Sequence, residues 1–292
     1  MNKNRGGMSF SMKKIIITGC NGQLGRAMNL ALAPYSDFEL VNTDVGELDI
    51  TSIDAVTKFV SDIKPYAIVN CAAHTAVDKA ESDWDNAYKI NAIGPRNLSI
   101  AATQNSAKLI HVSTDYVFDG TATKPYTEFD APNPQGAYGK TKLAGENMVK
   151  QFADRFFIFR TAWLYGDGKN FVKTMLRLSE DHESVKVVCD QVGSPTSTKE
   201  LANAIVSQMF TDNYGLFHAT CEGDTSWADF TKEIYRLAGK STEVIPITAA
   251  EYGAAAPRPA YSILDNYMLR LTSDYMFADW HDAIEEYIKG LQ

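Results

Sequence analysis

The beginning of the chain carries the pattern that most restricts its fold. Residues 13–18 form a short apolar, β-branched run that suits a buried parallel strand, and residues 26–33 have the apolar spacing of a helix. Between them stand Gly19, Gly22 and Gly25, at the spacing of a loop that holds the diphosphate of a dinucleotide. The first glycine permits a tight turn, the second lets phosphate reach the backbone, and the third lets helix and strand pack closely. The stretch predicts a dinucleotide-binding α/β fold.

The next part of the chain repeats this alternation of strand and helix. Strands are expected at residues 38–43, 67–71, 108–112 and 155–159, and helices at 52–63, about 83–104 and 138–152. Right-handed crossovers between such units give a doubly wound, Rossmann-type parallel sheet. Sheets of this type bind their ligands at the carboxyl ends of the strands, so we expect the chemistry of the protein there.

The alternation loosens after about residue 165. Helices are expected near residues 171–178, 198–210, 226–237 and 279–288, with a strand at 185–188. We therefore expect a dinucleotide-binding domain at residues 13–165 and a smaller substrate-binding lobe at 166–292. The boundary between them is approximate, elements of the two can interleave, and a cleft is expected between them.

Composition and charge narrow the class of protein. The formal net charge of −8 argues against a surface that binds nucleic acid or an anionic membrane. No apolar run reaches the roughly 20 residues of a membrane-spanning helix. Residues 1–12 lack the apolar centre of a signal peptide, so we expect a flexible extension there. The four cysteines are scattered, which favours a reducing cytoplasm over a disulfide scaffold or a zinc site.

An acidic residue ends the second expected strand. Asp44 lies about 20 positions beyond the glycine loop, where a carboxylate can hydrogen-bond an adenosine ribose and disfavour a 2′-phosphate. This position favours NAD over NADP, although Arg26 beside the loop is a cation that can still assist a phosphate. Asp49 and Ile50 follow, either flanking the adenine or simply preceding the next helix.

The third expected strand runs into small residues and a histidine. Ala72 and Ala73 suit close passage of a cofactor across the sheet edge. His74 has no paired Ser or Cys motif nearby, so we favour a positioning or structural role for it over that of a catalytic base.

Tyr138 and Lys142 are four residues apart on an expected helix and therefore share one face. An ammonium beside a phenol favours the phenolate, and we expect Lys142 to lower the pKa of Tyr138 from roughly 10. Such a tyrosine can exchange a proton with a substrate oxygen near neutral pH. The spacing alone is common by chance. It gains meaning because Thr114, at the end of the fourth expected strand, should lie at the same sheet edge as the glycine loop.

These blocks together resemble the extended short-chain dehydrogenase/reductases, and within them the reductases that act on the C4 ketone of a dTDP-linked deoxysugar. The similarity runs from about residue 13 to the last helix. It is carried by the glycine loop, by Tyr138 and Lys142, and by the stretches at residues 70–81, 113–118, 160–163, 171–177 and 190–196. The resemblance implies NADH or NADPH as the cofactor and a dTDP-sugar as the substrate.

The resemblance also implies roles for individual residues. Tyr138 would protonate the C4 keto oxygen as hydride arrives, Lys142 would hold the nicotinamide ribose, and Thr114 would hydrogen-bond the reacting oxygen. The implied substrate contacts are Thr114, Asp115, Trp163 and Arg258. The implied cofactor contacts are Gly19, Gly22, Gln23, Leu24, Gly25, Asp44, Asp49, Ile50, Ala73, His74, Thr75, Tyr138 and Lys142. No metal is assigned, because Arg26 and Ala27 stand where some relatives carry an acidic residue, and a homodimer is left open.

Three other interpretations were weighed. A sugar-nucleotide 4-epimerase or 4,6-dehydratase shares the fold, but dehydratases tend to place a Glu after the Asp, and Tyr116 stands there. A non-catalytic regulatory subunit commonly loses the Tyr or the Lys, and both are present. A Walker A reading of residues 139–141 fails because Pro134 occupies the position of its first glycine.

Overall fold

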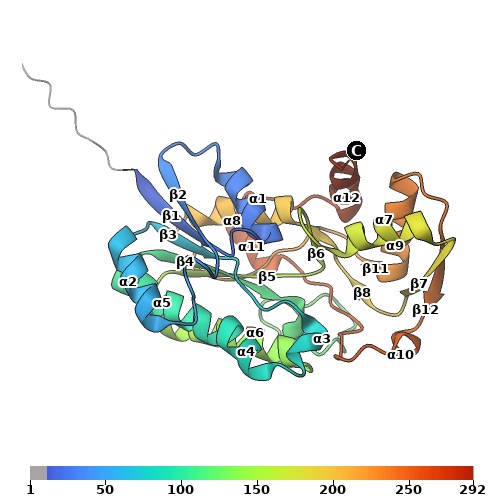
Figure 1. Cartoon of the computed structure of the whole chain (residues 1–292), viewed down its shortest axis with the longest axis horizontal. Coiled ribbons are helices and arrows are strands. Elements are labelled where there is room, and N and C mark those ends of the chain that lie inside the picture. Colours follow the sequence, from blue (N-terminus) through green and yellow to red (C-terminus); the bar gives the residue numbers. More distant parts are fainter. Residues whose placement is uncertain (1–11, 292) are drawn as a thin grey trace, which may run out of the picture.

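A six-stranded parallel sheet is the frame of the molecule (Figure 1). The computed structural model describes residues 12–291, so the expected extension lies outside the described residues except for Met12. The strand order is β10-β5-β4-β3-β1-β2, and every neighbouring pair is parallel. The strands are β1 (Lys13–Thr18), β2 (Phe38–Thr43), β3 (Ala67–Asn70), β4 (Lys108–Thr114), β5 (Phe156–Thr161) and β10 (Gly215–His218). The doubly wound Rossmann-type sheet predicted from the sequence is confirmed.

Helices cover both faces of this sheet (Figure 1). Helices α1 (Gln23–Leu32) and α8 (Thr198–Met209) pack together on one face. Helices α2 (Ile53–Ile63), α5 (Gly94–Gln104) and α6 (Ala137–Phe152) lie side by side on the other.

Strand β1 shows why its central residues, Ile15 to Ile17, are all apolar. Its side chains alternate between the two faces of the sheet. Ile15 and Ile17 belong to the core cluster of α1 and α8, whereas Ile16 belongs to the cluster of α2, α5 and α6. All three are fully buried, so a strand covered on both faces needs an unbroken apolar run.

The long helix expected at residues 83–104 is interrupted. It consists of α4 (Trp84–Tyr88), a π-helical turn (Lys89–Ile93) and α5. The wider turn lies where α6 comes close, because a Cβ at Gly145 of α6 would be 2.1 Å from the Asn91 carbonyl oxygen. Such turns are frequent at functional sites, and no residue pattern in the segment marked this one in advance.

The C-terminal part of the chain contributes to two regions. Strand β10 forms the edge of the main sheet and α8 covers it, although both follow residue 165. The remaining elements include a parallel pair of strands, β7 with β12. These remaining elements are β6 (Leu164–Tyr165), α7 (Phe171–Asp181), β7 (Ser184–Val188), β8 (Val192–Gly193), β9 (Thr196–Ser197), β11 (Thr225–Ser226), α9 (Trp227–Leu237), β12 (Glu243–Ile247), α10 (Ala249–Tyr252), α11 (Tyr267–Thr272) and α12 (Trp280–Lys289). A short helix, α3 (Val77–Ala80), belongs instead to the first half of the chain, between β3 and α4. The sequence reading missed β10 and β12, and a division at residue 165 stays a prediction.

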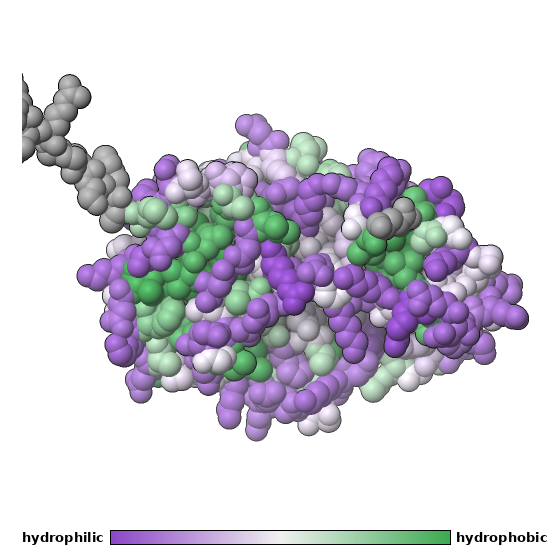
Figure 2. All heavy atoms as spheres, turned by 45° about the horizontal axis from the view of Figure 1, so that its top comes forward, coloured by the Kyte–Doolittle hydropathy of each residue, from purple (hydrophilic) through white to green (hydrophobic). Residues whose placement is uncertain are grey.

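The surface is mixed in character. Figure 2 shows hydrophilic side chains over most of the visible face, with apolar side chains gathered in separate regions. Within residues 12–291, no helix has both the length and the apolar character needed to cross a membrane.

Candidate active site

The glycine loop joins β1 to α1 at the carboxyl edge of the sheet. Gly19 has a φ of +60°, and a Cβ there would be 2.8 Å from the backbone nitrogen of Ala72, at the end of β3. Gly22 is the N-cap of α1 and donates its N–H to the Gly19 carbonyl at 3.0 Å, but it has no side chain to cap the helix, and no other side chain of residues 12–291 does so. An uncapped helix N-terminus favours an anion, so the loop fits the diphosphate of a dinucleotide.

A substitution at Gly25 tests this close packing. A Cβ at Gly25 would be 2.4 Å from the Gly19 carbonyl oxygen and 2.6 Å from the Cys20 Cα, and neither backbone atom can rotate away. We expect Gly25→Ala to weaken dinucleotide binding by at least about tenfold, because the loop must shift (a loss of about 1.4 kcal/mol or more). Fluorescence titration measures the affinity. Gly46→Ala is the matched control, since a Cβ there meets nothing within 4 Å.

Asp44 lies against the glycine loop as the sequence predicts. Its carboxylate accepts the backbone N–H of Asn21 at 3.3 Å and the backbone N–H of Val45 at 2.8 Å. The Asp49 carboxylate instead accepts the N–H and hydroxyl of Thr51, directly before the Ser52 N-cap of α2. Ile50 is buried. Of these residues, Asp44 is the one that touches the loop.

His74 is held in place by Asn91, a residue near the middle of the expected helix at 83–104 to which the sequence assigned no role. The Asn91 side chain accepts the His74 N–H at 2.8 Å, donates to the His74 carbonyl at 3.1 Å, and donates to the Thr141 hydroxyl on α6 at 3.1 Å. It therefore ties the residues after β3 to the helix that carries Tyr138. The π-helical turn aims this amide inward, which is why sequence spacing alone did not reveal it.

Helix α6 brings Tyr138 and Lys142 to the sheet edge. Lys142 is 3 % exposed, and its Nζ donates to the Val112 carbonyl of β4 at 2.6 Å. Burial lowers the pKa of Lys142 to about 8, and the charge of Glu146 on the next turn opposes that effect. An ammonium is thus kept at the sheet edge by a buried carboxylate beneath it.

The predicted lowering of the Tyr138 pKa is wrong for this structure. Burial raises the pKa of Tyr138 to about 12, the nearby charge of Asp115 acts in the same direction, and the Thr114 hydroxyl opposes them. Lys142 does not offset this, because its ammonium is turned to the Val112 carbonyl. Tyr138 is therefore a protonated phenol, a proton donor and not a base.

Thr114 and Asp115 stand beside this phenol at the end of β4. Thr114 is the last residue of the strand and is buried. Its hydroxyl donates to Asp115 Oδ1 at 2.9 Å and accepts the Tyr116 N–H at 3.2 Å. Burial raises the pKa of Asp115 to about 6, and its Oδ2 has no hydrogen-bond partner among residues 12–291.

A buried ion pair lies beneath the site and was not foreseen. Arg160 of β5 donates to both carboxylate oxygens of Glu146 at 2.8 Å, and the Ser113 hydroxyl donates to the same carboxylate at 2.6 Å. The side chains of Glu146 and Arg160 are 0 % and 1 % exposed. Glu146 is one turn after Lys142 on α6, so the helical spacing was a usable signal.

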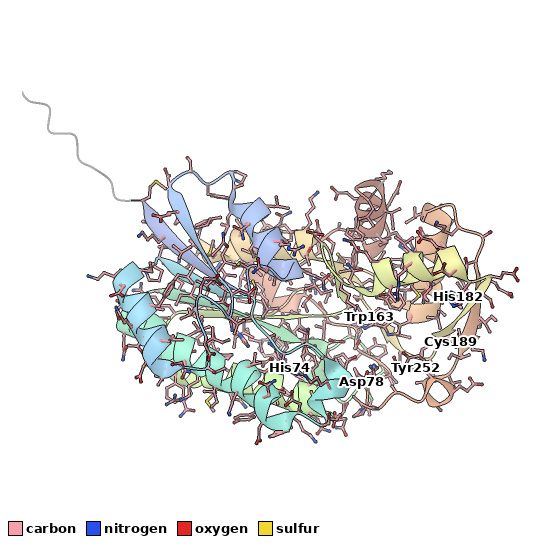
Figure 3. The ribbon with its side chains drawn as sticks, in the orientation of Figure 1. His74, Asp78, Trp163, His182, Cys189 and Tyr252 are labelled. Atoms are coloured by element: carbon pink, nitrogen blue, oxygen red, sulfur yellow. The ribbon has the colours of Figure 1, made fainter. Side chains whose placement is uncertain are left out.

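Trp163 adopts a left-handed backbone conformation, with φ of +49°, which is unusual for a bulky side chain. Its indole stacks on Trp227 of α9, with ring centroids 3.5 Å apart and planes at 7°. A Cβ at Gly193 would be 2.6 Å from this indole. Figure 3 shows Trp163 where the sheet half of the molecule meets the C-terminal half. Because Trp227 covers one face, only the remaining surface of the indole is available to a sugar.

Arg258 is bound by a residue from the other half of the molecule. Its guanidinium donates to both oxygens of Asp78, at 3.1 and 2.8 Å, and the Ala256 N–H donates to Asp78 at 3.0 Å. Figure 3 shows Asp78 at the junction of the two halves. The Arg258 guanidinium holds the pKa of Asp78 below its usual range. Arg258, the predicted substrate contact, therefore forms a bidentate ion pair with Asp78.

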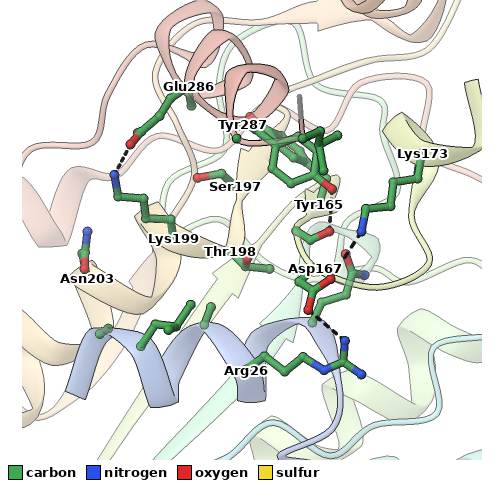
Figure 4. Close-up of a pocket in the computed structure, with 18 residues that line it drawn as sticks. Arg26, Tyr165, Asp167, Lys173, Ser197, Thr198, Lys199, Asn203, Glu286 and Tyr287 are labelled. Atoms are coloured by element: carbon green, nitrogen blue, oxygen red, sulfur yellow. Dashed lines mark hydrogen bonds and ion pairs between the residues drawn. The ribbon is translucent and has the colours of Figure 1, made fainter. Parts of the chain in front are cut away.

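A cavity of about 540 Å³ lies apart from this group of residues, among α1, α7, α8 and α12. Figure 4 shows Arg26 and Lys173 bridged by Asp167 on one side and Lys199 paired with Glu286 on the other. Of the residues expected in the site, only Gln23 lines it. Within residues 12–291, no three His, Cys, Asp or Glu side chains gather in a metal-binding group.

The sheet, the glycine loop after β1, and the Tyr and Lys on α6 beside Thr114 define an extended short-chain dehydrogenase/reductase. The family model described as RmlD substrate binding domain matches residues 12–292, and the chain belongs to this family.

Several proteins of known name are similar over nearly the whole chain. A dTDP-4-dehydrorhamnose reductase structure from Clostridium acetobutylicum is 54 % identical, with a TM-score of 0.94, and the match covers 96 % of this chain and 99 % of that one. One from Bacillus anthracis in complex with NADP is 43 % identical, with a TM-score of 0.93 and coverage of 96 % and 100 %. The dTDP-4-dehydrorhamnose reductase of Aggregatibacter actinomycetemcomitans is 38 % identical over 287 residues, which are 94 % and 98 % of the two chains.

Proposed function

We propose that this protein reduces the C4 ketone of dTDP-4-dehydro-L-rhamnose with NADH or NADPH, giving dTDP-L-rhamnose for cell-surface polysaccharide. The names of its relatives support this substrate and this cofactor. The observation that carries the proposal is the position of the Tyr138 phenol beside Thr114, at the same sheet edge as the glycine loop and the helix N-terminus that follows it. A ketone reductase needs a proton donor there, together with a place for a dinucleotide.

The residues at the start of α1 fit a dinucleotide diphosphate, because the N–H groups after Gly22 have no capping side chain. Gly22, Gln23 and Leu24 would hold the diphosphate, Asp44 the adenosine ribose and Lys142 the nicotinamide ribose. The bound nicotinamide supplies the hydride. Thr114 would orient the keto oxygen by turning its hydroxyl hydrogen from Asp115 Oδ1 to that oxygen, and Tyr138 would donate its phenolic proton there as negative charge develops.

Lys142 contributes charge and position. Its ammonium is held on the Val112 carbonyl at the same sheet edge, where it would fix the nicotinamide ribose within reach of the Tyr138 helix. Asp115 and Trp163 would bound the sugar, and Arg258 is suited to the negative charge of the diphosphate that links sugar and nucleoside. The free thiols of all four cysteines support an expected location in a reducing cytoplasm.

A direct assay tests the proposal. The purified protein is first checked for bound NAD, and loss of NADH or NADPH absorbance is then followed with dTDP-4-dehydro-L-rhamnose. The proposed reductase consumes one reduced cofactor for each sugar. Tightly bound NAD, with conversion of a sugar nucleotide that carries a C4 hydroxyl and no net consumption of cofactor, would instead identify a 4-epimerase or a 4,6-dehydratase. Cofactor binding with no turnover of any 4-keto sugar would identify a regulatory subunit.

Cofactor affinity should depend on pH through Lys142. The pKa of this ammonium in the free protein is about 8, well below the ordinary lysine value, so the proton is lost as pH rises through 8. We expect the affinity for NADPH to fall above pH 8 by up to about tenfold per pH unit. Titrations from pH 6 to 10 measure this. Lys142→Met should bind NADPH weakly, with an affinity that does not change with pH. Lys140→Met, which removes an exposed lysine on the same helix, should still lose affinity for NADPH above pH 8.

Asp44 should set the choice between the two cofactors. Its carboxylate lies against the glycine loop and would repel a ribose 2′-phosphate while accepting a ribose hydroxyl. We expect a higher kcat/KM with NADH than with NADPH, and a shift of about tenfold toward NADPH in Asp44→Ser. A competition assay with both cofactors measures the ratio. NADPH preference in the unaltered protein would contradict this role.

A further inference from the structure

Helix α6 begins without a cap of its own, although it carries both Tyr138 and Lys142. Its N-cap residue is Gly136, no side chain there accepts a hydrogen bond, and no acidic residue occupies the first turn. Helices α2, α7, α8 and α9 each have a Ser or Asn N-cap whose side chain accepts a backbone N–H. The first turn of α6 therefore needs a partner from elsewhere, because its N–H groups have no partner within the helix.

Glu81 is that partner. Its Oε1 accepts the N–H of Ala137, the first residue of α6, at 2.7 Å across 56 positions of sequence. The carboxylate approaches this closely because Gly136 has no side chain. A Cβ at Gly136 would be 2.8 Å from Glu81 Oε1. A negative charge at a helix N-terminus also interacts favourably with the helix dipole.

The backbone around Glu81 is fixed on both sides. Ala80 is fully buried and belongs to a small apolar cluster with Ala87 and Ala137, against which the Tyr138 ring packs. Three residues before Glu81, Asp78 accepts two hydrogen bonds from Arg258 and one from the Ala256 N–H. One short segment, residues 77–81, thus joins the start of α6 to the loop that carries Arg258.

We propose that Glu81 is a positioning residue for Tyr138, acting through the first turn of α6. Tyr138 is the second residue of the helix, so its backbone direction, and with it the approach of the phenol to Thr114, depends on that turn being closed. Loss of the Glu81 carboxylate frays the turn and moves the phenol. The effect falls on the proton-transfer step and not on the glycine loop. This inference rests on the function proposed above.

Four variants of the full-length protein test it: Glu81→Ala, Glu81→Gln, Gly136→Ser and the double variant Glu81→Ala/Gly136→Ser. We expect Glu81→Ala to lower kcat about tenfold with cofactor affinity within threefold of the unaltered protein. Glu81→Gln should lose less, since its amide oxygen still accepts the Ala137 N–H. Asp85→Ala is the matched control, because it removes a nearby exposed carboxylate in the first turn of α4 and should leave kcat unchanged.

The double variant gives the decisive readout. Gly136→Ser alone places a side chain against Glu81 Oε1 and should reduce kcat. The next closest atom to the new Cβ belongs to the Pro257 ring, at 3.2 Å, and a small shift of that ring relieves the contact. Once Glu81 is shortened, the same hydroxyl has space to cap the N–H groups of Tyr138 or Gly139. We therefore expect kcat of Glu81→Ala/Gly136→Ser to be at least threefold higher than kcat of Glu81→Ala. Equal kcat in the single and double variants, or an unchanged kcat in Glu81→Ala, would overturn the proposal.

Hydrogen exchange separates this inference from the proposed function. Exchange at the amides of residues 137–140 needs no substrate, and it should be faster in Glu81→Ala and slower again in the double variant. Unchanged exchange would overturn the positioning role even in an active reductase. An unaltered protein that reduces no 4-keto sugar would overturn the proposed function, while the exchange measurement still decides the role of Glu81.

Discussion

Tyr138→Phe is expected to reduce kcat by about a hundredfold to ten-thousandfold while NADH or NADPH binds almost as tightly as before. The phenol is the proton donor in the proposed reaction, and its raised pKa keeps the proton in place until a charged keto oxygen can receive it. Removing one oxygen leaves the ring, which packs against Tyr116 with centroids 5.4 Å apart. Single-turnover reduction of the 4-keto sugar, with fluorescence titration of the cofactor, measures both effects.

Tyr116→Phe is the matched control for that experiment. Tyr116 is the neighbouring tyrosine, in edge-on contact with the Tyr138 ring, but it is not part of the proposed proton transfer. Its variant should keep kcat within a few-fold. If Tyr138→Phe and Tyr116→Phe lost similar activity, Tyr138 would be a packing residue and the proton would have another source.

Glu146→Ala is expected to lower the free energy of unfolding by about 3–5 kcal/mol, because it leaves the Arg160 guanidinium buried without its carboxylate. Arg160 donates two 2.8 Å hydrogen bonds to Glu146, and both side chains are excluded from solvent. For a chain of this length the loss corresponds to a fall in Tm of roughly 5–10 °C. Differential scanning calorimetry measures it at pH 7.

An exposed pair on another helix is the control for this prediction. Glu285 and Lys289 form a surface ion pair on α12, and Glu285→Ala should leave the free energy of unfolding almost unchanged, because solvent screens an exposed pair. Replacing both buried partners by apolar residues, as in Glu146→Leu/Arg160→Met, should be less harmful than Glu146→Ala alone. A double variant that is as unstable as the single one would show that hydrogen bonds to other groups, such as Ser113, dominate.

Local structure that is determined by neighbouring residues was predicted correctly. The apolar run of β1, the glycine loop and the small residues after β3 determine a strand, a turn and a close approach within a few positions of one another. Tyr138 and Lys142 share a helix face because a helix turns every 3.6 residues. The family resemblance and the Rossmann-type sheet are confirmed for the same reason, since they rest on these local patterns.

The features that were missed depend on contacts between distant segments. Strand β10 is only four residues long and gains its place at the sheet edge by pairing with β5. Asn91 acts through a π-helical turn, and Glu81 acts on a residue 56 positions away. The Tyr138 pKa was predicted in the wrong direction because burial and the charge of Asp115 cannot be read from a four-residue spacing. The roles of the remaining site residues stay predictions.

The proposed reaction delivers hydride to C4 of the sugar while Tyr138 donates a proton to the adjoining oxygen. The most direct measurement uses reduced cofactor carrying deuterium at the transferable position of its nicotinamide, with dTDP-4-dehydro-L-rhamnose as substrate and NMR of the product. We expect one deuterium at C4 of the product sugar for each cofactor oxidised. Deuterium that stays on the cofactor, or that appears at another carbon of the sugar, would contradict it.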